Sequence, residues 1–414
     1  MNETRRVKSK TKKSKLSPKS NPKTVDDRLC LTMIVKNESK IIKRCLDSLK
    51  EHIDYWVIVD TGSTDGTQEM IKKHLENIPG ELHESKFISF GHNRTESLNL
   101  SKGKGKYILL MDADYEFKVM EKDFKKYITK QNAEGYLLTE CGGLNKDGSY
   151  KGFNYRNKII FRNDLDWVFR GSTHEVADLK GDRDPLCEIY DGAWIHNRYD
   201  GGSKSEKYTR DIKLLRKDLQ DDPNNDRAMF YLGESYIHLA EQKGINAGQE
   251  CVELLKNAIE CYKKRSEMKN TWSQEVYFSL FKMARAKTFL AGEIDVLGYL
   301  RAYDYKPSRL EPIHQVLRHC RENKLYNIGY IIGKAVLENK KDLESEALFV
   351  DGDVYLYQML DEFSICASWS GHNKEAITVI EGIIPKIEGD IEKETEDRIK
   401  ENLKICRELD SKSV

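Results

Sequence analysis

The stretch "YILLMDAD", residues 107–114, runs from apolar side chains directly into two carboxylates, Asp112 and Asp114. A short apolar run of this kind is typical of a strand that is buried on both faces of a sheet. Carboxylates that follow such a strand lie where open α/β sheets bind their ligands. Aspartate is also a common turn residue, so the triplet indicates a ligand site only if neighbouring segments bring further polar groups to the same place.

Two earlier segments repeat this pattern. Asn37 and Glu38 follow the apolar residues 29–35, and Asp60 ends the apolar segment 55–60. Strands that alternate with amphipathic helices predict a parallel, doubly wound sheet, in which the polar clusters after all three strands lie along one edge. The strands are expected at 29–35, 55–60 and 107–111, and the helices at 40–53 and 68–78.

The later part of the chain divides into a mixed segment and a helical one. Residues 136–200 combine strands, expected at 135–140 and 158–162, with loops rich in aromatic residues. From residue 204 the spacing predicts helices to the end of the chain. Five residues of this part match the tetratricopeptide pattern in part: Leu232, Gly233, Tyr236, Ala258 and Tyr262. The sequence therefore predicts an α/β domain at 29–203 and an α-helical, tetratricopeptide-like domain at 204–414.

The composition argues against several classes of protein. Lys+Arg 69 against Asp+Glu 68 leaves a net charge of +1, so no global charge points to nucleic acid. The nine cysteines are scattered and never spaced as C-x-x-C, which favours reduced thiols over a zinc or disulfide framework. No apolar run approaches the ~18–20 residues of a membrane span, and we expect a cytoplasmic protein.

The amino-terminal segment differs from the rest in charge. Residues 1–24 contain nine Lys or Arg residues, one Glu and almost no apolar side chains. Such a segment cannot bury enough surface to fold, so a disordered basic tail is expected over residues 1–28. It suits an anionic surface, nucleic acid or a nuclear import receptor, and equally a solubilising role without a specific partner.

Asp60 leads into the turn "TGSTDGT", which carries a second carboxylate, Asp65. Gly62 and Gly66 permit backbone angles that other residues rarely adopt. The turn matches neither the dinucleotide-binding motif G-x-G-x-x-G nor a phosphate loop. A carboxylate at a strand end needs no cradle of glycine amides to accept hydrogen bonds from the base or the ribose of a nucleoside.

The D-x-D spacing suits a divalent cation, because an extended segment points both carboxylates the same way. Mg²⁺ or Mn²⁺ prefers oxygen ligands and is usually shared with substrate phosphates. Such a cation would neutralise a diphosphate leaving group. Arg94, in "FGHNRTESLNL", is either a further charge against that phosphate or a solvated arginine near a helix end.

Two later residues are candidates for the same site. His196 belongs to an apolar run, "WIHN", that opens into a Gly-rich loop, as metal ligands at strand ends do. A lone histidine is more often structural, which is the competing interpretation. Glu175, in "THEV", is a candidate general base if an acceptor can reach it.

The segments "LTMIVKNES", "VIVDTGSTDGT" and "ILLMDAD" together resemble glycosyltransferase family 2, whose members have the GT-A fold. The resemblance continues through "THEV" and "WIHN" into the helical segment, which looks like the branch with C-terminal tetratricopeptide-like helices. It covers residues 29 to 385. The family implies an inverting transfer, in which an acceptor attacks the anomeric carbon of a sugar and a nucleoside diphosphate departs.

By this resemblance Asp60 contacts the base or ribose, Asp112 contacts the ribose or donor sugar, and Asp114 and His196 hold Mn²⁺ or Mg²⁺. Glu175 takes the place of the base. Many members have Arg-Asn before the D-x-D motif where this chain has His92-Asn93-Arg94-Thr95. The phosphate contact is therefore expected at Arg94 or within one or two residues of it. Donor contacts are also expected from residues that flank these carboxylates at the strand ends: Val35, Asn37, Glu38, Asp65 and Ala113.

The sequence thus predicts a metal-dependent glycosyltransferase that uses a nucleotide sugar, with a UDP-sugar as the expected donor. The sequence does not name the acceptor: a protein, a peptide, a glycan, a lipid and a small molecule all stay open, and a membrane lipid is the least favoured. The helical domain is expected to shape the acceptor side or to form a homodimer. Two other functions compete with this one. A sugar nucleotidyltransferase would need a Gly-rich loop with Arg or Lys after the first strand, where this chain has "VKNESK". A non-catalytic helical-repeat scaffold would carry a degenerate transferase domain.

Overall fold

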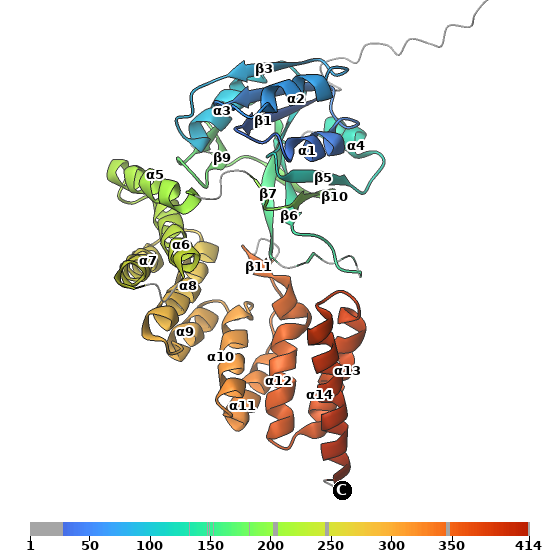
Figure 1. Cartoon of the computed structure of the whole chain (residues 1–414), viewed down its shortest axis with the longest axis vertical. Helices are drawn as coiled ribbons and strands as arrows, with labels where there is room; N and C mark the ends of the chain where they lie inside the picture. Colours follow the sequence, from blue (N-terminus) through green and yellow to red (C-terminus); the bar gives the residue numbers. More distant parts are fainter. Residues whose placement is uncertain are drawn as a thin grey trace, which may run out of the picture.

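The computed structural model describes residues 28–412, apart from 132, 147, 149, 152, 182, 202–205, 245–247 and 345–347. An α/β part lies at one end of the molecule, and a long array of helices extends away from it (Figure 1). The predicted basic tail, apart from Arg28, lies outside the described residues. So does most of the segment in which the predicted domain boundary falls.

The first half of the sheet is parallel, as the sequence predicts. Its strands are β1 (Leu29–Val35), β2 (Tyr55–Asp60), β3 (Gly80–Glu84) and β4 (Tyr107–Leu110), in the order β3-β2-β1-β4. The register pairs Val35 with Asp60, and Thr32 with Leu110. The residues that follow β1, β2 and β4 therefore meet at one edge of the sheet, which confirms the predicted convergence.

The second half of the sheet is mixed, whereas the sequence indicated a mostly parallel sheet. The order continues from β4 through β7 and β6 to β10 and β5; β7 is antiparallel to both its neighbours, and β5 is antiparallel to β10. A short strand from the helical part, β11 (Val350–Asp351), adds to the start of β7. These strands are β5 (Tyr115–Val119), β6 (Gly135–Cys141), β7 (Phe153–Arg162) and β10 (Cys187–Asn197).

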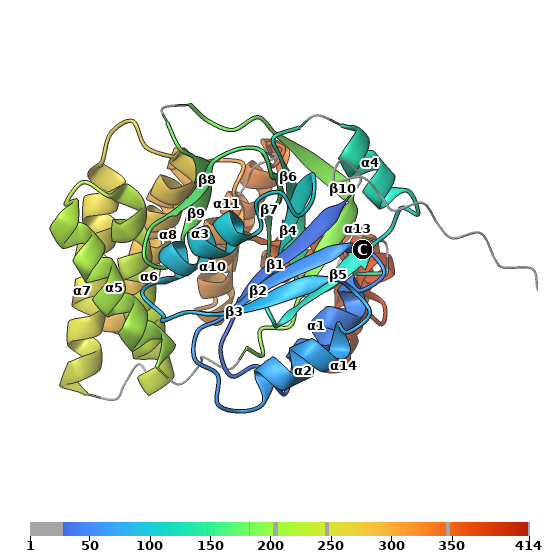
Figure 2. The same cartoon turned by 90° about the horizontal axis from the view of Figure 1, so that it is seen from above.

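Helices cover both faces of the sheet. Alternation along β4 sends Leu109 and Met111 into a core beneath α1 (Ile42–Leu49), α2 (Thr67–His74) and α4 (Phe124–Lys130). Ile108 and Leu110 point into a second core beneath α3 (Phe90–Leu100) and the hairpin of β8 (Trp167–Arg170) and β9 (Val176–Leu179). Figure 2 shows α3 and this hairpin across the sheet from α1 and α2. The apolar run is therefore buried on both faces, as predicted.

The part of the chain that follows is largely helical and tetratricopeptide-like. Gly233 lies in α6, where a Cβ atom would come 2.8 Å from the ring of Tyr262 in α7, so the absence of a side chain permits the close packing of this helix pair. None of the described helices is long and apolar enough to cross a membrane. The helices are α5 (Lys207–Asp221), α6 (Asp226–Lys243), α7 (Gln249–Glu267), α8 (Ser273–Ala291), α9 (Val296–Tyr305), α10 (Glu311–Glu322), α11 (Tyr326–Glu338), a π-helical turn (Val354–Gln358), α12 (Met359–Trp369), α13 (Asn373–Ile387) and α14 (Lys393–Lys412).

Candidate active site

The loop after β1 and the turn after β2 are joined by hydrogen bonds. The backbone N–H of Asn37 donates to Ser63 Oγ at 2.8 Å, and Asn37 Oδ1 accepts from Thr64 N at 2.8 Å. The Glu38 N–H donates to Thr67 Oγ1 at 2.8 Å. Gly62 and Gly66 have the positive φ angles expected of them, 103° and 89°. The two loops therefore form one preorganised surface at the edge of the sheet.

Asp65 lies in the middle of this loop contact. Its carboxylate accepts from the Ser39 N–H at 3.0 Å and from Thr67 N and Oγ1 at 3.1 and 2.6 Å. Burial raises the pKa of Asp65, but these hydrogen bonds outweigh it and lower the pKa to about 2. The structure thus gives Asp65 a role in joining the loops, and the expected donor contact stays a prediction.

Asp60 is fully buried, and its two carboxylate oxygens differ. Oδ1 accepts from the N–H groups of Gly62 and Ser63 at 2.9 and 2.8 Å and from Gln68 Nε2 at 3.1 Å. Oδ2 is buried and has no hydrogen-bond partner among the described residues. Buried polar atoms in folded proteins are almost always hydrogen-bonded. Asp60 Oδ2 is therefore an acceptor that a ligand with an N–H or O–H group can satisfy.

The D-x-D segment is a turn between β4 and β5, closed by a hydrogen bond from Tyr115 N to Asp112 O at 3.1 Å. The expectation of an extended segment is wrong here, because the chain reverses to place β5 beside β10. Asp112 stays on the α3 side of the sheet, like Leu110 before it, and reaches Arg94. The carboxylate of Asp114 instead accepts from the backbone of Gly201.

Arg94 bridges two of the candidate residues. Its Nη2 lies 2.8 Å from Asp112 Oδ1, and its Nε donates to Glu175 Oε1. The side chains of Arg94 and Glu175 are only 12% and 9% exposed. Burial disfavours the charged guanidinium, but Asp112 and Glu175 outweigh it and raise the pKa of Arg94. Arg94 is thus neither solvated nor free, and it brings Glu175 to the edge that carries Asp112. The expected phosphate contact of Arg94 stays a prediction.

Asp114 directly precedes β5, and His196 lies near the end of the adjacent strand β10. His196 lies opposite Glu116 in the register of β10 and β5, and the N–H of Arg198 donates to Asp114 O at 3.1 Å. Burial, followed by the charge of Asp112, raises the pKa of Asp114 to about 6. Burial and then Arg198 lower the pKa of His196. A carboxylate crowded by another carboxylate and a neutral imidazole suit a divalent cation.

Asp114 and His196 by themselves do not form a complete cage for a metal. Among the described residues, no group of three or more His, Cys, Asp or Glu side chains is arranged to hold a metal. A cation at Asp114 and His196 would therefore depend on oxygens from a bound substrate, as Mg²⁺ and Mn²⁺ at phosphate sites commonly do. Val35, the register partner of Asp60, and Ala113, between the two aspartates, are both buried, and their expected donor contacts stay predictions.

One residue at this edge was not predicted from the sequence. Glu140, near the end of β6, is fully buried and accepts hydrogen bonds from Tyr115, Asn197 and Asn157. Tyr115 follows Asp114, and Asn197 follows His196. A charged residue that ends the apolar segment 135–140 is the same signal that identified Asp60, and it could have indicated Glu140.

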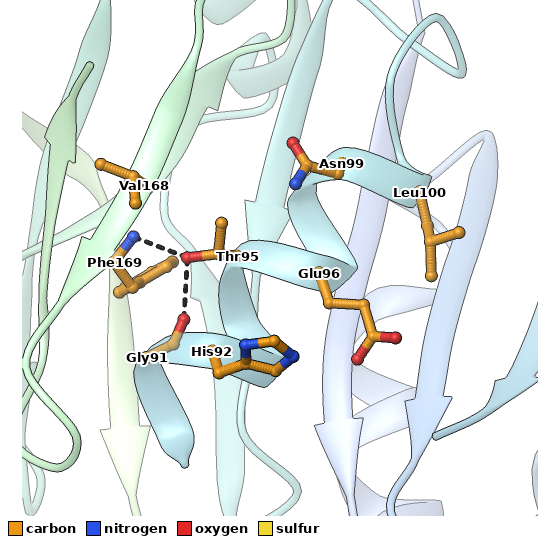
Figure 3. Close-up of a pocket in the computed structure, with 8 residues that line it drawn as sticks. All are labelled: Gly91, His92, Thr95, Glu96, Asn99, Leu100, Val168 and Phe169. Carbon is orange, nitrogen blue, oxygen red and sulfur yellow. Dashed lines mark hydrogen bonds between the residues drawn. The ribbon is translucent and has the colours of Figure 1, made fainter. Parts of the chain in front are cut away.

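A surface pocket lies elsewhere, between the outer side of α3 and β8 (Figure 3). In its wall Thr95 Oγ1 accepts from the Phe169 N–H at 2.9 Å and donates to Gly91 O at 2.7 Å. None of the predicted site residues lines it. Its lining residues are Gly91, His92, Thr95, Glu96, Asn99, Leu100, Val168 and Phe169.

The fold and the site define an α/β protein with a cluster of carboxylates at the carboxyl edge of its sheet. Residues 30–177 match the family model described as "Glycosyl transferase family 2". The matched segment contains every predicted site residue except His196.

Two named proteins are similar to parts of this chain. The SPbeta prophage-derived glycosyltransferase SunS of Bacillus subtilis is 26% identical over 317 residues, which cover 74% of this chain and 71% of SunS. A TPR repeat-containing protein of Synechococcus elongatus is 27% identical over 36% of this chain and 36% of its own length.

Solved structures resemble the chain more weakly. TarS of S. aureus, residues 1–349 in complex with UDP-GlcNAc, is 14% identical with a TM-score of 0.34 over 64% of this chain and 92% of its own. The match to the longer TarS structure covers 55% of that chain and 68% of this one, with a TM-score of 0.33. At these scores the likeness carries no information about function.

Proposed function

We propose that the protein is an inverting, metal-dependent glycosyltransferase that transfers a sugar from a UDP-sugar to an acceptor. The observation that carries this proposal is Asp60 Oδ2, a buried acceptor without a partner, at the same edge as Asp112 and Asp114. An N–H of the uracil ring or a ribose hydroxyl of the donor would satisfy this oxygen. The match of residues 30–177 to the family 2 model supports the transfer chemistry.

In the proposed reaction each carboxylate has a separate role. Asp60 binds the nucleoside, and Asp112 binds the ribose or the donor sugar. Asp114 and His196 would hold Mn²⁺ or Mg²⁺, which would supply positive charge against a diphosphate leaving group. Burial, followed by the charge of Asp112, raises the pKa of Asp114, and this supports the assignment because a bound cation would stabilise the charged form of the carboxylate.

Glu175 is the proposed general base. It would accept the proton of the acceptor nucleophile as that atom bonds to the anomeric carbon. The bond from the anomeric carbon to the diphosphate oxygen breaks on the opposite face of the sugar, and its electron pair leaves with UDP. Arg94 holds the Glu175 carboxylate at the edge that carries Asp112.

The test is a thermal-shift screen of UDP-, GDP-, CMP- and dTDP-sugars, each with Mn²⁺ or with EDTA. We expect stabilisation by UDP-sugars with Mn²⁺ only, and loss of the effect in Asp114→Asn. Asp164→Asn is the matched control, because Asp164 follows β7 at the opposite edge of the sheet, where Arg162 pairs with Tyr107. A well-folded protein that responds to no donor would contradict the proposal and favour a scaffold role.

A further inference from the structure

The loop that carries Glu175, residues 171–175, has an unusual backbone. Gly171 has a φ angle of 94° and His174 has a φ angle of 50°. Residues other than glycine rarely adopt positive φ, and they keep it only where the surrounding structure holds the chain there. The contacts around this loop therefore determine where Glu175 lies.

One side of the loop is held by α3. The N–H of Phe90 donates to Ser172 O at 3.0 Å. A Cβ atom at Gly91 would come 2.2 Å from Gly171 O, so the two backbones touch directly. Arg94, one turn further along the same helix, donates to Glu175. This side belongs to the α/β part of the chain itself.

The other side of the loop is held by α5, the first helix of the tetratricopeptide-like region. Asp218 accepts from both the N–H and the hydroxyl of Ser172, at 2.9 and 2.5 Å. Asp211, which lies about two turns before Asp218 in the same helix, is fully buried and accepts from Thr173 Oγ1 at 3.4 Å. Two consecutive loop residues are thus anchored to carboxylates outside the α/β part.

The next helix, α6, holds the residue beside Glu175. The ring of Tyr231 stacks on His174 with 4.1 Å between ring centroids and 7° between planes. Arg227 Nε donates to the carbonyl of His174 at 2.8 Å, and Arg227 Nη1 lies 3.1 Å from Glu275 in α8. The helical region therefore holds both the side chain and the backbone of His174, whose positive φ angle places it in the left-handed region.

We propose that Asp218, Arg227 and Tyr231 are positioning residues for Glu175, so that the first two helices of the tetratricopeptide-like region form part of the catalytic machinery. This inference rests on the proposed function, in which Glu175 is the base. None of the three residues contacts the reacting atoms. They act by holding a strained loop whose last residue must stay within reach of the acceptor.

The first test follows the loop itself by hydrogen exchange and mass spectrometry, in Arg227→Gln and Tyr231→Leu. We expect faster exchange in peptides that cover 169–179 and unchanged exchange in β1 and β2. Arg216→Gln is the matched control: Arg216 donates to Tyr236 at 2.8 Å and so forms an Arg–Tyr pair that links α5 to α6 rather than to the loop. Loop exchange equal to that of the control would overturn the inference.

The second test separates positioning from stability. With a UDP-sugar and water as acceptor, we expect kcat of UDP release to fall roughly 10- to 100-fold in both variants, while the donor Kd stays at the control's value. Tyr231→Phe keeps the stacked ring and should restore kcat. Normal kcat in Arg227→Gln and Tyr231→Leu overturns the positioning role alone. A wild-type protein that binds no nucleotide sugar overturns the proposed function as well.

Discussion

The side chain of Asn197 donates a 2.6 Å hydrogen bond to the carboxylate of Glu140, a fully buried residue on the neighbouring strand. The hydroxyl of Tyr115 donates to the other oxygen of Glu140 at 2.9 Å. Asn197 directly follows His196, and Tyr115 directly follows Asp114. One buried carboxylate thus fixes the distance between the two backbone segments that carry the proposed metal ligands.

Replacing Glu140 by Gln should disturb this spacing. Gln presents an N–H group to one of the two donors, so one buried hydrogen bond is lost, at a cost of about 1–3 kcal/mol in the free energy of unfolding. We expect a lower Tm and a weaker Mn²⁺-dependent stabilisation by UDP-sugar. Glu121→Gln is the control, because Glu121 accepts from Tyr190 near the other end of β10. An unchanged Mn²⁺ response in Glu140→Gln would show that the spacing does not depend on this residue.

Replacing Asp60 by Asn tests the donor site directly. The amide oxygen of Asn can still accept from the N–H groups of Gly62 and Ser63, so the turn should fold. The position of Oδ2 becomes a donor, and a charge-assisted hydrogen bond to the nucleoside, worth about 1.5–3 kcal/mol, is lost. We expect the donor Kd from calorimetry to rise roughly 10- to 100-fold. A donor Kd equal to that of Asp164→Asn would show that Asp60 does not bind the nucleoside.

Replacing Arg94 by Gln leaves two partly buried carboxylates, Asp112 and Glu175, side by side without their shared partner. Loss of one partner of a buried ion pair is strongly destabilising, and partial exposure of Asp112 reduces the effect to about 2–4 kcal/mol. Adding Glu175→Gln should recover part of this loss. Urea unfolding of the two single variants and the double variant measures the coupling between the residues, which we expect at about 1–3 kcal/mol. Strict additivity would mean that the bridge does not form in solution.

The exposed pair of Arg170 and Asp178 is a suitable comparison for this cycle. Their side chains are 55% and 29% exposed, and exposed pairs contribute only about 0–1 kcal/mol. The same double-mutant cycle on this pair should therefore give a coupling well below that of Arg94 and Glu175.

The stability of the protein should fall in mild acid because of His174. Burial, followed by the charges of Lys207 and Arg227, lowers the pKa of His174 to about 3 from 6.5. As the pH falls below 6.5 the unfolded chain binds a proton that the folded protein does not, so stability is lost progressively towards pH 3. Between pH 7 and pH 5 we expect a loss of about 1–2 kcal/mol, from the 1.36 kcal/mol that each pKa unit represents.

The variant His174→Asn isolates this effect, since asparagine tolerates positive φ but does not titrate. Urea unfolding at pH 7 and pH 5 should show a smaller loss in the variant than in the wild type. Equal losses would assign the acid sensitivity to another group, such as His314, whose pKa burial lowers to about 4.

The sequence predicted β1, β2 and β4 well, because each is a short apolar run followed by polar residues. It did not predict β3, whose residues GELHE form no such run. Local patterns were enough to place Asp60 and Asp112 at one edge. Strand pairing over long distances was not predictable in this way: β7 enters between β4 and β6 in the antiparallel sense, and nothing in the segment 153–162 encodes its neighbours. β11, a two-residue strand inside a helical region, was also not predictable, because its partner strand lies far away in the sequence.

The sequence indicated which residues belong to the candidate site, but it did not indicate which of them contact one another. Glu175 and Asp112 were chosen for separate reasons, and only the structure shows that Arg94 joins them. Glu140 was missed because its segment was considered only as a strand. The turn at Asp112–Asp114 differs from the expected extended conformation because β5 must reverse direction to pair with β10, a constraint that arises some eighty residues later in the chain.

The pairing of Val350 with Asn154 has a consequence for how the protein is made. A ribosome synthesises some two hundred residues between these two partners, so the start of β7 waits without its last neighbour while most of the helices emerge. Contacts between residues so distant in sequence slow folding and lengthen the time for which a strand edge is open to wrong partners. The start of β7 therefore remains an open strand edge until residues 350–351 have been synthesised.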